Sequence, residues 1–192
     1  MSGRFANVRQ DAAQLKQLSR FISKVLRHEP ELLDLEPEPG GWVMVDELLG
    51  ALMRRGYSVS RADLDYLVTT SDKQRFSFEE TGCRIRANQG HSIDIDLQLE
   101  PVQPPTTLFH GTHEGAKDSI LTGGLKKMDR HHVHLSADTD TARLVGQRRG
   151  KPVIFEVDAQ AMAQTGVTFY CSKNGVWLTD FVAAEFLRLV PG

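Results

Sequence analysis

The apolar residues near the start of the chain recur with the period of an α-helix. From Leu15 to Leu26 they fall three or four positions apart and form one stripe, which predicts an amphipathic helix. We expect this helix to end at about 27–28, because Pro30 disfavours helical backbone in Glu29, the residue before it.

Two further helices are predicted downstream of this one. A short apolar run at 42–45 is followed by Asp46, which we expect to cap a second helix that ends at Gly56. Ser60 and Asp63 have the spacing of a capping box, which predicts the start of a third helix.

Two alternating runs then predict a β-hairpin. Residues 76–78 and 83–87 alternate as strands do, and Gly82 lies where the chain would turn. Three helices followed by a hairpin are in the order of a winged helix. The first half is therefore expected to be a winged-helix lobe.

A stretch with three prolines, 100–106, separates the two halves of the chain. Proline fits neither a helix interior nor a central strand, so we place a boundary there, with domains at 1–100 and 106–192. The second half predicts a β-rich α+β unit. Its expected strands are 108–109, 133–135, 153–157, 167–170, 176–179 and 186–190, and its expected helices are 116–121 and one capped near Ser136.

Composition narrows the class of protein. Of 192 residues, 40% are hydrophobic and 25% are charged, which is typical of a globular protein. No apolar run approaches the roughly 18 to 20 residues that a membrane helix needs, and 1–10 lack the apolar run of a signal peptide. We therefore expect a cytoplasmic protein without a membrane partner, and interpret Cys83 and Cys171 as reduced packing residues.

Charge argues for a local anion site and against a surface that coats nucleic acid. The formal net charge is −2, which does not suit non-specific binding to a polyanion. Basic residues nevertheless gather at 27–28, at 84–92 and at 146–151. Arg84 and Arg86 would share one face of a strand, and two arginines followed by polar donors suit an anion.

The second half contains candidate ligand-binding residues but no recognised nucleotide-binding loop. No glycine-rich dinucleotide fingerprint or P-loop is present. His110-Gly111-Thr112 places a histidine and a hydroxyl beside a glycine that allows close approach of a ligand. The histidines at 131–134 have no cysteine or carboxylate at metal-ligand spacing, so we expect no metal site.

Six ordered motifs closely resemble the RNA 2′-phosphotransferases of the Tpt/Kpt type, the tRNA-splicing enzymes. They occur in family order over about 18–189, nearly the whole chain. They are Leu26-Arg27-His28, Arg86-Ala87-Asn88-Gln89-Gly90-His91-Ser92, His110-Gly111-Thr112, His132-Val133-His134-Leu135-Ser136, Gly146-Gln147-Arg148 and Gly175-Val176-Trp177-Leu178-Thr179.

The resemblance implies a winged-helix RNA-binding lobe, an ADP-ribosyltransferase-like lobe that binds NAD, and a site between them. It assigns the catalytic basic residues to Arg27, His28, Arg86 and Arg148, with Arg149 as the alternative to the last. It places NAD at His110, Gly111, Thr112, His134, Leu135, Ser136 and Val176, and the RNA phosphate also at Gln89, His91 and Ser92. Relatives that modify proteins carry glutamate where this chain has Val176.

The implied reaction consumes NAD and removes an internal 2′-phosphate from RNA. It passes through an ADP-ribosylated RNA 2′-phosphate and yields RNA with a free 2′-hydroxyl, ADP-ribose 1″,2″-cyclic phosphate and nicotinamide. A 2′-phosphate arrives as an anion, since its second pKa is around 6, so it needs fixed positive charge more than a base. We expect a monomer that binds NAD and 2′-phosphorylated RNA.

Two other functions are considered. A plain winged-helix nucleic-acid binder accounts for the residues up to about 99 and leaves the motifs of the second half without a role. An ADP-ribosyltransferase acting on nucleic-acid terminal phosphates or on protein is the other alternative. The segment 181–186 lacks the Val-Pro and Tyr often seen in the family after Trp-Leu-Thr, which bears on that loop alone.

Overall fold

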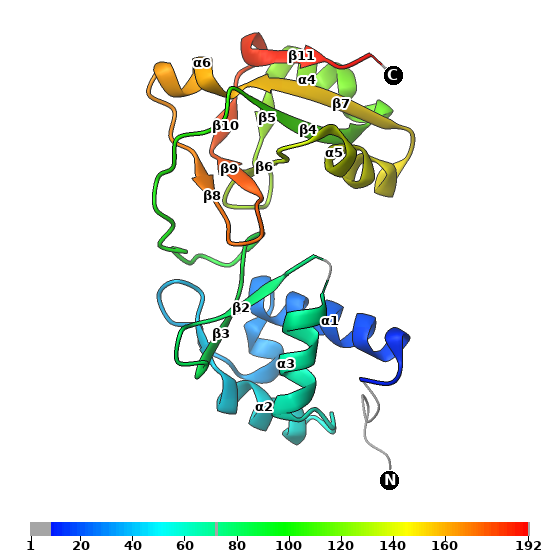
Figure 1. The fold of residues 1–192 in the computed structure, drawn as a ribbon, viewed down its shortest axis with the longest axis vertical. Helices are drawn as coiled ribbons and strands as arrows, with labels where there is room; N and C mark the ends of the chain where they lie inside the picture. The colour runs from blue at the N-terminus through cyan, green and yellow to red at the C-terminus, as the bar shows by residue number, and fades with distance from the viewer. Residues whose placement is uncertain (1–8, 72, 192) are drawn as a thin grey trace. The chain divides into compact units, whose positions relative to one another are not determined.

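The computed structural model describes residues 9–71 and 73–191 and contains two compact units. The first unit ends at Gln98 and the second begins at Leu99. Figure 1 shows the elements of each unit. None of the helices within the described residues is both long and apolar enough to cross a bilayer.

Three helices form most of the first unit. They are α1 (Ala12–Arg27), α2 (Val45–Arg54) and α3 (Arg61–Thr70), with a 3₁₀ turn η1 (Pro30–Leu33) after the first. The predicted end of α1 is confirmed, because helical backbone stops at Arg27 and His28 is the cap. The capping box is also confirmed: Asp63 N–H donates to Ser60 Oγ, and Ser60 N–H donates to Asp63 Oδ2.

The start of α2 differs from the prediction. Its cap is Met44, which makes no side-chain cap hydrogen bond, and Asp46 lies inside the first turn. The carboxylate there still favours the helix, because the N-terminal end of a helix carries partial positive charge. Val45 is consequently helical, and only Val43–Met44 form the preceding strand β1.

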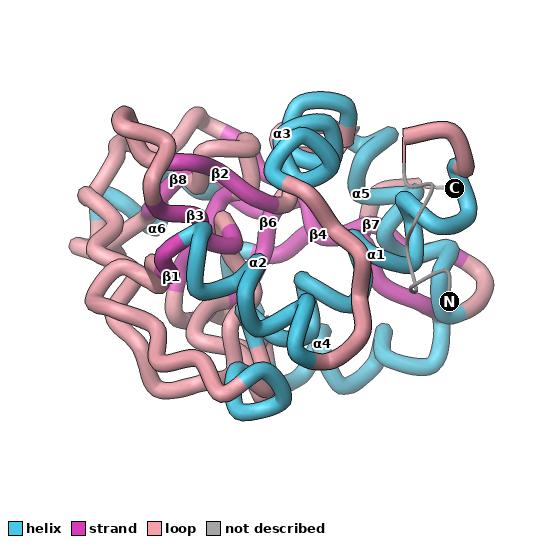
Figure 2. The backbone as a smooth tube through the Cα atoms, turned by 90° about the horizontal axis from the view of Figure 1, so that it is seen from below, coloured by secondary structure: helices cyan, strands magenta, loops and turns pink. Residues whose placement is uncertain are grey.

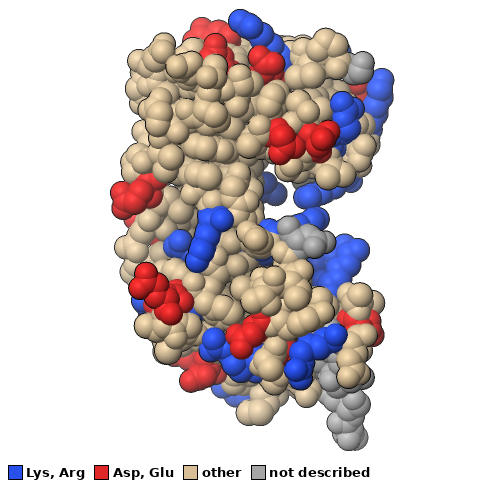
Figure 3. Space-filling model, in the orientation of Figure 1, with Lys and Arg blue, Asp and Glu red and all other residues tan. Residues whose placement is uncertain are grey.

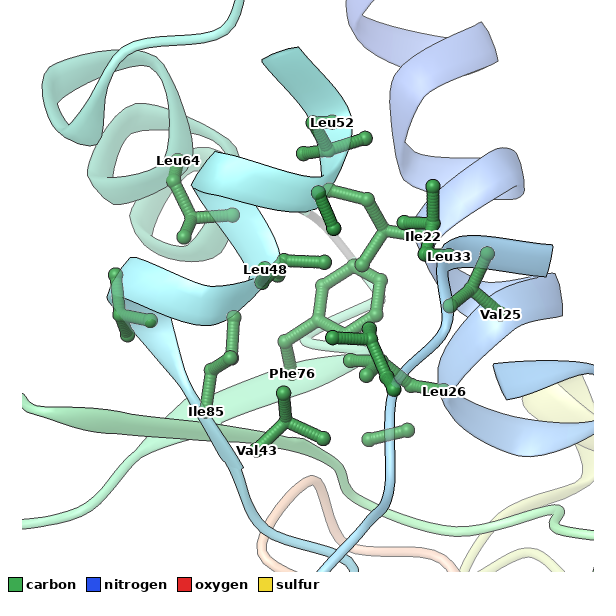
Figure 4. Packing of buried hydrophobic residues seen from close by; sticks show 14 of the residues in the cluster. Ile22, Val25, Leu26, Leu33, Val43, Leu48, Leu52, Leu64, Phe76 and Ile85 are labelled. Carbon is green, nitrogen blue, oxygen red and sulfur yellow. The ribbon is translucent and has the colours of Figure 1, made fainter. Parts of the chain in front are cut away.

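A three-stranded antiparallel sheet completes this unit. Strands β2 (Phe76–Phe78) and β3 (Arg84–Ala87) form the predicted hairpin, and β1 pairs with the other edge of β3 in the order β1–β3–β2. Helix α1 packs against β3, and α2 packs against β1; in Figure 2, β1 and β3 lie beside α2. Side chains from helices and strands interdigitate in one core, in which Phe76 and Ile85 meet Leu26 and Leu48 (Figure 4).

The second unit is built on two small antiparallel sheets and a two-stranded ribbon. One sheet has the order β11–β7–β4 and the other β6–β9–β8, while β10 pairs with β5. The strands are β4 (Thr107–His113), β5 (Leu125–Lys126), β6 (Val133–Leu135), β7 (Pro152–Asp158), β8 (Tyr170–Cys171), β9 (Trp177–Thr179), β10 (Phe181–Val182) and β11 (Leu187–Leu189).

Short helices cover these sheets. They are α4 (Lys117–Gly123), α5 (Thr139–Gly146) and α6 (Ala159–Gln164), with 3₁₀ turns η2 (Glu114–Ala116), η3 (Gln147–Arg149) and η4 (Ala184–Phe186). Helix α5 packs on β4 and β7, as Figure 1 shows. Its cap is Asp138, whose carboxylate accepts from Thr141 N–H, so the prediction of Ser136 is wrong.

Two other predictions need correction. The strand expected at 167–170 is confined to Tyr170–Cys171, because the backbone of 167–169 serves other contacts: Phe169 C=O accepts from Val102 N–H. Cys83 is exposed rather than packed, whereas Cys171 is partly buried, and both are free thiols. Mixed helices and small antiparallel sheets make the fold α+β.

Candidate functional site

The end of α1 and the segment after β3 meet in the first unit, although they are 64 positions apart in the chain. The backbone N–H of Ser92 donates to Arg27 C=O at 2.9 Å. His28 Nδ1 and Ser92 Oγ are 2.8 Å apart. The structure therefore brings together Arg27, His28 and Ser92, three of the predicted site residues. The partial negative charge at the end of the helix favours both basic side chains.

Arg84 and Arg86 share a face of β3 as predicted, but their surroundings differ. Arg84 forms ion pairs with Glu79 at 2.6 Å and Glu38 at 2.8 Å, and these carboxylates raise its pKa. Arg86 Nη1 donates to two backbone carbonyls, those of Gly40 and Leu97, at 3.1 Å each. Arg84 is thus neutralised by its neighbours.

Arg86 keeps its positive charge uncompensated. Among residues 9–71 and 73–191 it has no carboxylate partner, and burial alone lowers its pKa. Its Nε is buried and has no acceptor in that part of the chain. An unsatisfied buried donor costs about 1–3 kcal/mol, so an anion that accepts from this guanidinium would be stabilised. α1 packs against β3, the strand that carries Arg86.

The turn after β3 is held by buried polar residues. Asn88 accepts from Ser77 Oγ at 2.7 Å and donates to Gln74 C=O at 2.6 Å. His91 is 1% exposed, and a Cβ on Gly41 would lie 3.4 Å from its Nε2. Burial of this ring favours a role in shaping the turn over direct contact with RNA. Gln89 is partly exposed.

In the second unit an isolated bridge joins β4 to the end of β6. Phe109 and Ser136 exchange two backbone hydrogen bonds, of 2.8 and 2.7 Å. The bridge places His110 beside His134, and His110 Nδ1 lies 3.0 Å from His134 C=O. A carbonyl can only accept, so Nδ1 carries the proton. Burial lowers the pKa of His110, and the charge of Arg130 lowers it further, which leaves Nε2 of the neutral ring as an acceptor.

His134 has the opposite tautomer. Arg130 Nη1 lies 2.8 Å from His134 Nδ1. Because a guanidinium has no acceptor, Nδ1 must accept, and the ring proton is on Nε2. The two predicted NAD-site histidines therefore present one acceptor and one donor, and Arg130 contributes to both states.

Gly111 has a packing role that the sequence did not indicate. A Cβ there would lie 1.7 Å from the carbonyl oxygen of Ala142 in α5, and a Cβ on Gly146 would lie 2.4 Å from Thr112 C=O. The two glycines let α5 lie directly on β4. Close approach of α5 to β4 is by itself sufficient to require glycine at 111.

The remaining predicted residues of this unit divide between core and surface. Leu135 is buried in the core, and Ser136 forms the bridge to β4. Thr112 is half-buried on β4. Arg148 lies exposed in η3, which continues α5 and packs on β4. The side chain of its alternative, Arg149, lies outside the described part of the chain.

Val176 lies just before β9 on a turn held by Ser172. The hydroxyl of this buried serine accepts from Val176 N–H at 3.1 Å and donates to Val176 C=O at 3.0 Å. Gly175, with φ of 76°, closes the turn from β8 to β9. The backbone at Val176 is therefore fixed independently of its side chain.

Potential metal ligands are dispersed in the part of the chain that the structure describes. Among residues 9–71 and 73–191, no three His, Cys, Asp or Glu side chains are grouped to hold a metal. His132 contacts the Tyr170 ring edge-on at 5.4 Å, and burial lowers its pKa. On the face shown in Figure 3, both basic and acidic side chains are visible on each unit.

Three residues of these sites were not predicted from the sequence. Trp42, seen only as part of an apolar run, lies under the Arg86 guanidinium at 4.5 Å. Arg130 is not within a helix, so its spacing to His134 carries no signal. Ser172 resembles any loop serine. The glycine pair before Trp42, Gly40 and Gly41, has positive φ at both positions, and it is the sequence signal that could have drawn attention to this turn.

Comparison with known proteins decides the family. The family described as "RNA 2'-phosphotransferase, Tpt1 / KptA family" matches residues 13–181 of this chain. The chain belongs to the RNA 2′-phosphotransferase family. It is an enzyme of the transferase class. This confirms the family that the six sequence motifs indicated.

Relatives match over nearly their full length. A "Probable RNA 2'-phosphotransferase" of Trichormus variabilis is 58% identical over 181 residues, which are 94% of this chain and 99% of the relative. Proteins with the same description from Nostoc punctiforme and Hahella chejuensis are 53% and 50% identical. The matches cover 93% and 92% of this chain, and 98% and 95% of those relatives.

Proposed function

We propose that this RNA 2′-phosphotransferase removes an internal 2′-phosphate from RNA and transfers it to the ADP-ribose of NAD. The products are RNA with a 2′-hydroxyl, nicotinamide and ADP-ribose 1″,2″-cyclic phosphate. The observation that carries the proposal is the uncompensated, half-buried cation of Arg86 in a member of this family.

The phosphate side of the proposal rests on the first unit. Arg27 and His28 lie at the C-terminal end of α1, and Ser92 is tied to both. Arginine donates several fixed hydrogen bonds and keeps its charge, which suits the three oxygens of a phosphate. We assign Arg27, His28 and Arg86 to the 2′-phosphate, with Gln89 and Ser92 as neutral donors beside it and His91 behind the turn.

The NAD side rests on the second unit, whose residues fit a ribose. Ribose hydroxyls both donate and accept, and this unit offers an acceptor at His110 Nε2 and a donor at His134 Nε2. Thr112 adds a hydroxyl on the same strand as His110. When bound, NAD supplies an electrophilic anomeric carbon with nicotinamide as the leaving group.

The chain's own groups have defined tasks in this chemistry. In the first step a 2′-phosphate oxygen forms a bond to the anomeric carbon, and nicotinamide leaves with the electron pair of the broken C–N bond. The product is an ADP-ribosylated RNA 2′-phosphate. In the second step the 2″-hydroxyl forms a bond to phosphorus, and the RNA 2′-oxygen leaves and takes up a proton. Arg27, Arg86 and Arg148 stabilise the phosphoryl oxygens during both steps.

The absence of a carboxylate at Val176 fits this acceptor. A hydroxyl or amide acceptor benefits from a carboxylate that orients or activates it, whereas a phosphate is already ionised. A glutamate at this position would also repel the phosphate.

We also propose that residues 1–100 form a winged-helix RNA-binding lobe and that residues 106–192 form an ADP-ribosyltransferase-like NAD-binding lobe.

The direct test uses a short RNA with one internal 2′-phosphate, incubated with and without NAD. We expect the RNA to lose the mass of one phosphate only with NAD, with release of nicotinamide and a cyclic phosphate of ADP-ribose. Parallel reactions with 5′- or 3′-phosphorylated RNA detect transfer of ADP-ribose to terminal phosphates. Loss of phosphate without NAD would exclude the proposed reaction.

Arg148 is tested against a matched arginine. Arg148→Ala should reduce single-turnover rate by about a hundredfold or more, since removing one donor to a transition-state oxyanion costs 10²–10³. Arg143→Ala, an exposed arginine of α5, should react at nearly the wild-type rate. Equal rates for the two variants would move the assignment to Arg149.

A further inference from the structure

Arg86 is held by an aromatic ring and by two carbonyls of separate segments. Its guanidinium carbon lies 4.5 Å from the centre of the Trp42 ring, a distance at which a cation is attracted to the π face. Nη1 donates to the carbonyls of Gly40 and Leu97. The guanidinium therefore has its face and one of its amino groups engaged.

The segment that supplies these contacts is itself rigid. Glu38 and Trp42 pair across a tight turn in which Glu38 N–H donates to Trp42 C=O at 2.8 Å. Gly40 N–H donates to Asp96 C=O at 2.8 Å, so the turn is tied to the 96–98 segment. Gly40, with φ of 86°, has no room for a side chain, because a Cβ would lie 2.9 Å from the Trp42 ring.

The manner of this fixation matters for the charge. Carboxylates orient an arginine but also neutralise it and compete with an anionic ligand, as Glu79 and Glu38 do at Arg84. A π face and neutral carbonyls orient the guanidinium without supplying a competing anion. Nε and Nη2 form the other edge of the guanidinium, and Nε has no acceptor within the described residues.

We infer that Trp42 is a positioning residue of the phosphotransfer reaction, which with the carbonyls of Gly40 and Leu97 orients the Arg86 guanidinium toward the substrate phosphate. The inference rests on the proposed function, in which Arg86 contacts that phosphate. A planar guanidinium can be oriented in this way by a ring face and by carbonyls, whereas the ammonium of lysine cannot.

The experiment compares two replacements of Trp42 with a control replacement of Arg84, which lies on the same face of β3 as Arg86. Trp42→Leu removes the π face, and Trp42→Phe keeps a smaller one. We expect the leucine variant to lower the single-turnover rate at saturating RNA and NAD by about tenfold to a hundredfold, the cost of a misplaced catalytic group. The phenylalanine variant should retain most of the rate, and KM for NAD should not change in either.

Arg84→Gln is the control, because Arg84 also faces Trp42, at 5.8 Å, but is paired with carboxylates. It should react at the wild-type rate. Thermal unfolding shows whether each variant is folded. Titration of the active enzyme with 2′-phosphorylated RNA gives the fraction that binds substrate, so a loss of folded protein can be told from a lower rate. Fluorinated tryptophans at position 42 keep the ring's shape and weaken its π face, so they test the contact even if the leucine variant does not fold.

A double-mutant cycle measures whether the effects of replacing Trp42 and Arg86 on the rate are coupled. A purely structural role of Trp42 would not produce such coupling. In an Arg86→Lys background, Trp42→Leu should cost little further rate, because the oriented guanidinium is already lost. The inference would be overturned if the losses of rate caused by the Trp42 and Arg86 replacements were additive. It would also be overturned if both Trp42→Leu and the fluorinated tryptophan variants reacted at the wild-type rate. A fully active Arg86→Gln variant would instead refute the proposed role of Arg86, so the two failures are distinguishable.

Discussion

His110 and His134 have the same side chain, yet their neighbours give them opposite hydrogen-bonding roles. A backbone carbonyl fixes the proton of His110 on Nδ1, and Arg130 fixes that of His134 on Nε2. Neither state is visible from the sequence, where both are histidines in polar surroundings. The structure shows which nitrogen of each ring carries the proton, and this determines whether the other nitrogen can accept a hydrogen bond.

The protonation of His110 leads to a prediction about stability. Its folded-state pKa lies below the ordinary value of 6.5, so below pH 6.5 the unfolded chain takes up a proton that the folded chain does not. The contribution of His110 to the free energy of unfolding should therefore have its full value above pH 6.5. It should decrease as the pH falls from 6.5 toward the pKa of the folded state.

We expect the free energy of unfolding of the wild-type protein to fall between pH 7.5 and 5. Urea unfolding over that range should show a smaller loss for His110→Asn, since asparagine offers an N–H and does not titrate. His132, whose pKa is also lowered, leaves part of the dependence in place. Identical pH profiles for the two proteins would contradict the prediction.

At the scale of elements, the docking of α5 on β4 determines where Arg148 lies. Gly111 and Gly146 remove the side chains that would separate helix from strand, and η3 carries the chain from α5 to Arg148. A sequence motif that resembles a ligand loop is thus also a packing motif. The two uses are compatible because His110 and Gly111 point to opposite faces of β4.

Gly111→Ala should therefore unfold or displace α5. Its Cβ would collide with a backbone oxygen, and overpacking typically costs about 1–3 kcal/mol or more. We expect a lower midpoint of thermal unfolding together with a raised KM for NAD. Gly123→Ala in α4, where a Cβ would lie 3.9 Å from Lys126, is the matched control and should change neither. A stable Gly111→Ala protein with weakened NAD binding would instead favour direct ligand contact.

At the scale of the whole molecule, the formal net charge is −2, because 25 acidic residues outnumber 23 lysines and arginines. Some basic residues of the described part of the chain form exposed ion pairs, as Arg61 does with Asp65 at 2.8 Å. Such exposed pairs contribute little to stability, but they remove positive charge from the surface. RNA affinity should consequently depend on a few phosphate contacts.

This charge distribution predicts a weak salt dependence. If about three arginines contact phosphates, the logarithm of the RNA binding constant should fall with the logarithm of salt concentration with a slope of about −2. Titration of 2′-phosphorylated RNA at several KCl concentrations measures the slope, and Arg27→Ala should make it shallower. A slope of about −6 or steeper would indicate a broad basic surface.

Sequence patterns predicted the elements with long apolar periods or side-chain caps. The end of α1 at Arg27, the Ser60–Asp63 capping box and the hairpin around Gly82 were found because each depends on nearby residues alone. The strands β5 and β10 were missed, since each has two residues and exists only through its partner. The cap of α5 was misassigned for a different reason: Ser136 and Asp138 are both suitable cap residues, and only the structure shows that Asp138 is the cap.

The sequence by itself determined the family, the local elements and the residue types available for chemistry, because motif order and hydrophobic period are carried by the chain. Only the tertiary structure decided that Arg86 lies on Trp42 while Arg84 is paired with carboxylates, and that His110 accepts where His134 donates. Charge compensation and tautomer depend on groups far apart in the sequence, and folding alone brings those groups within hydrogen-bonding distance.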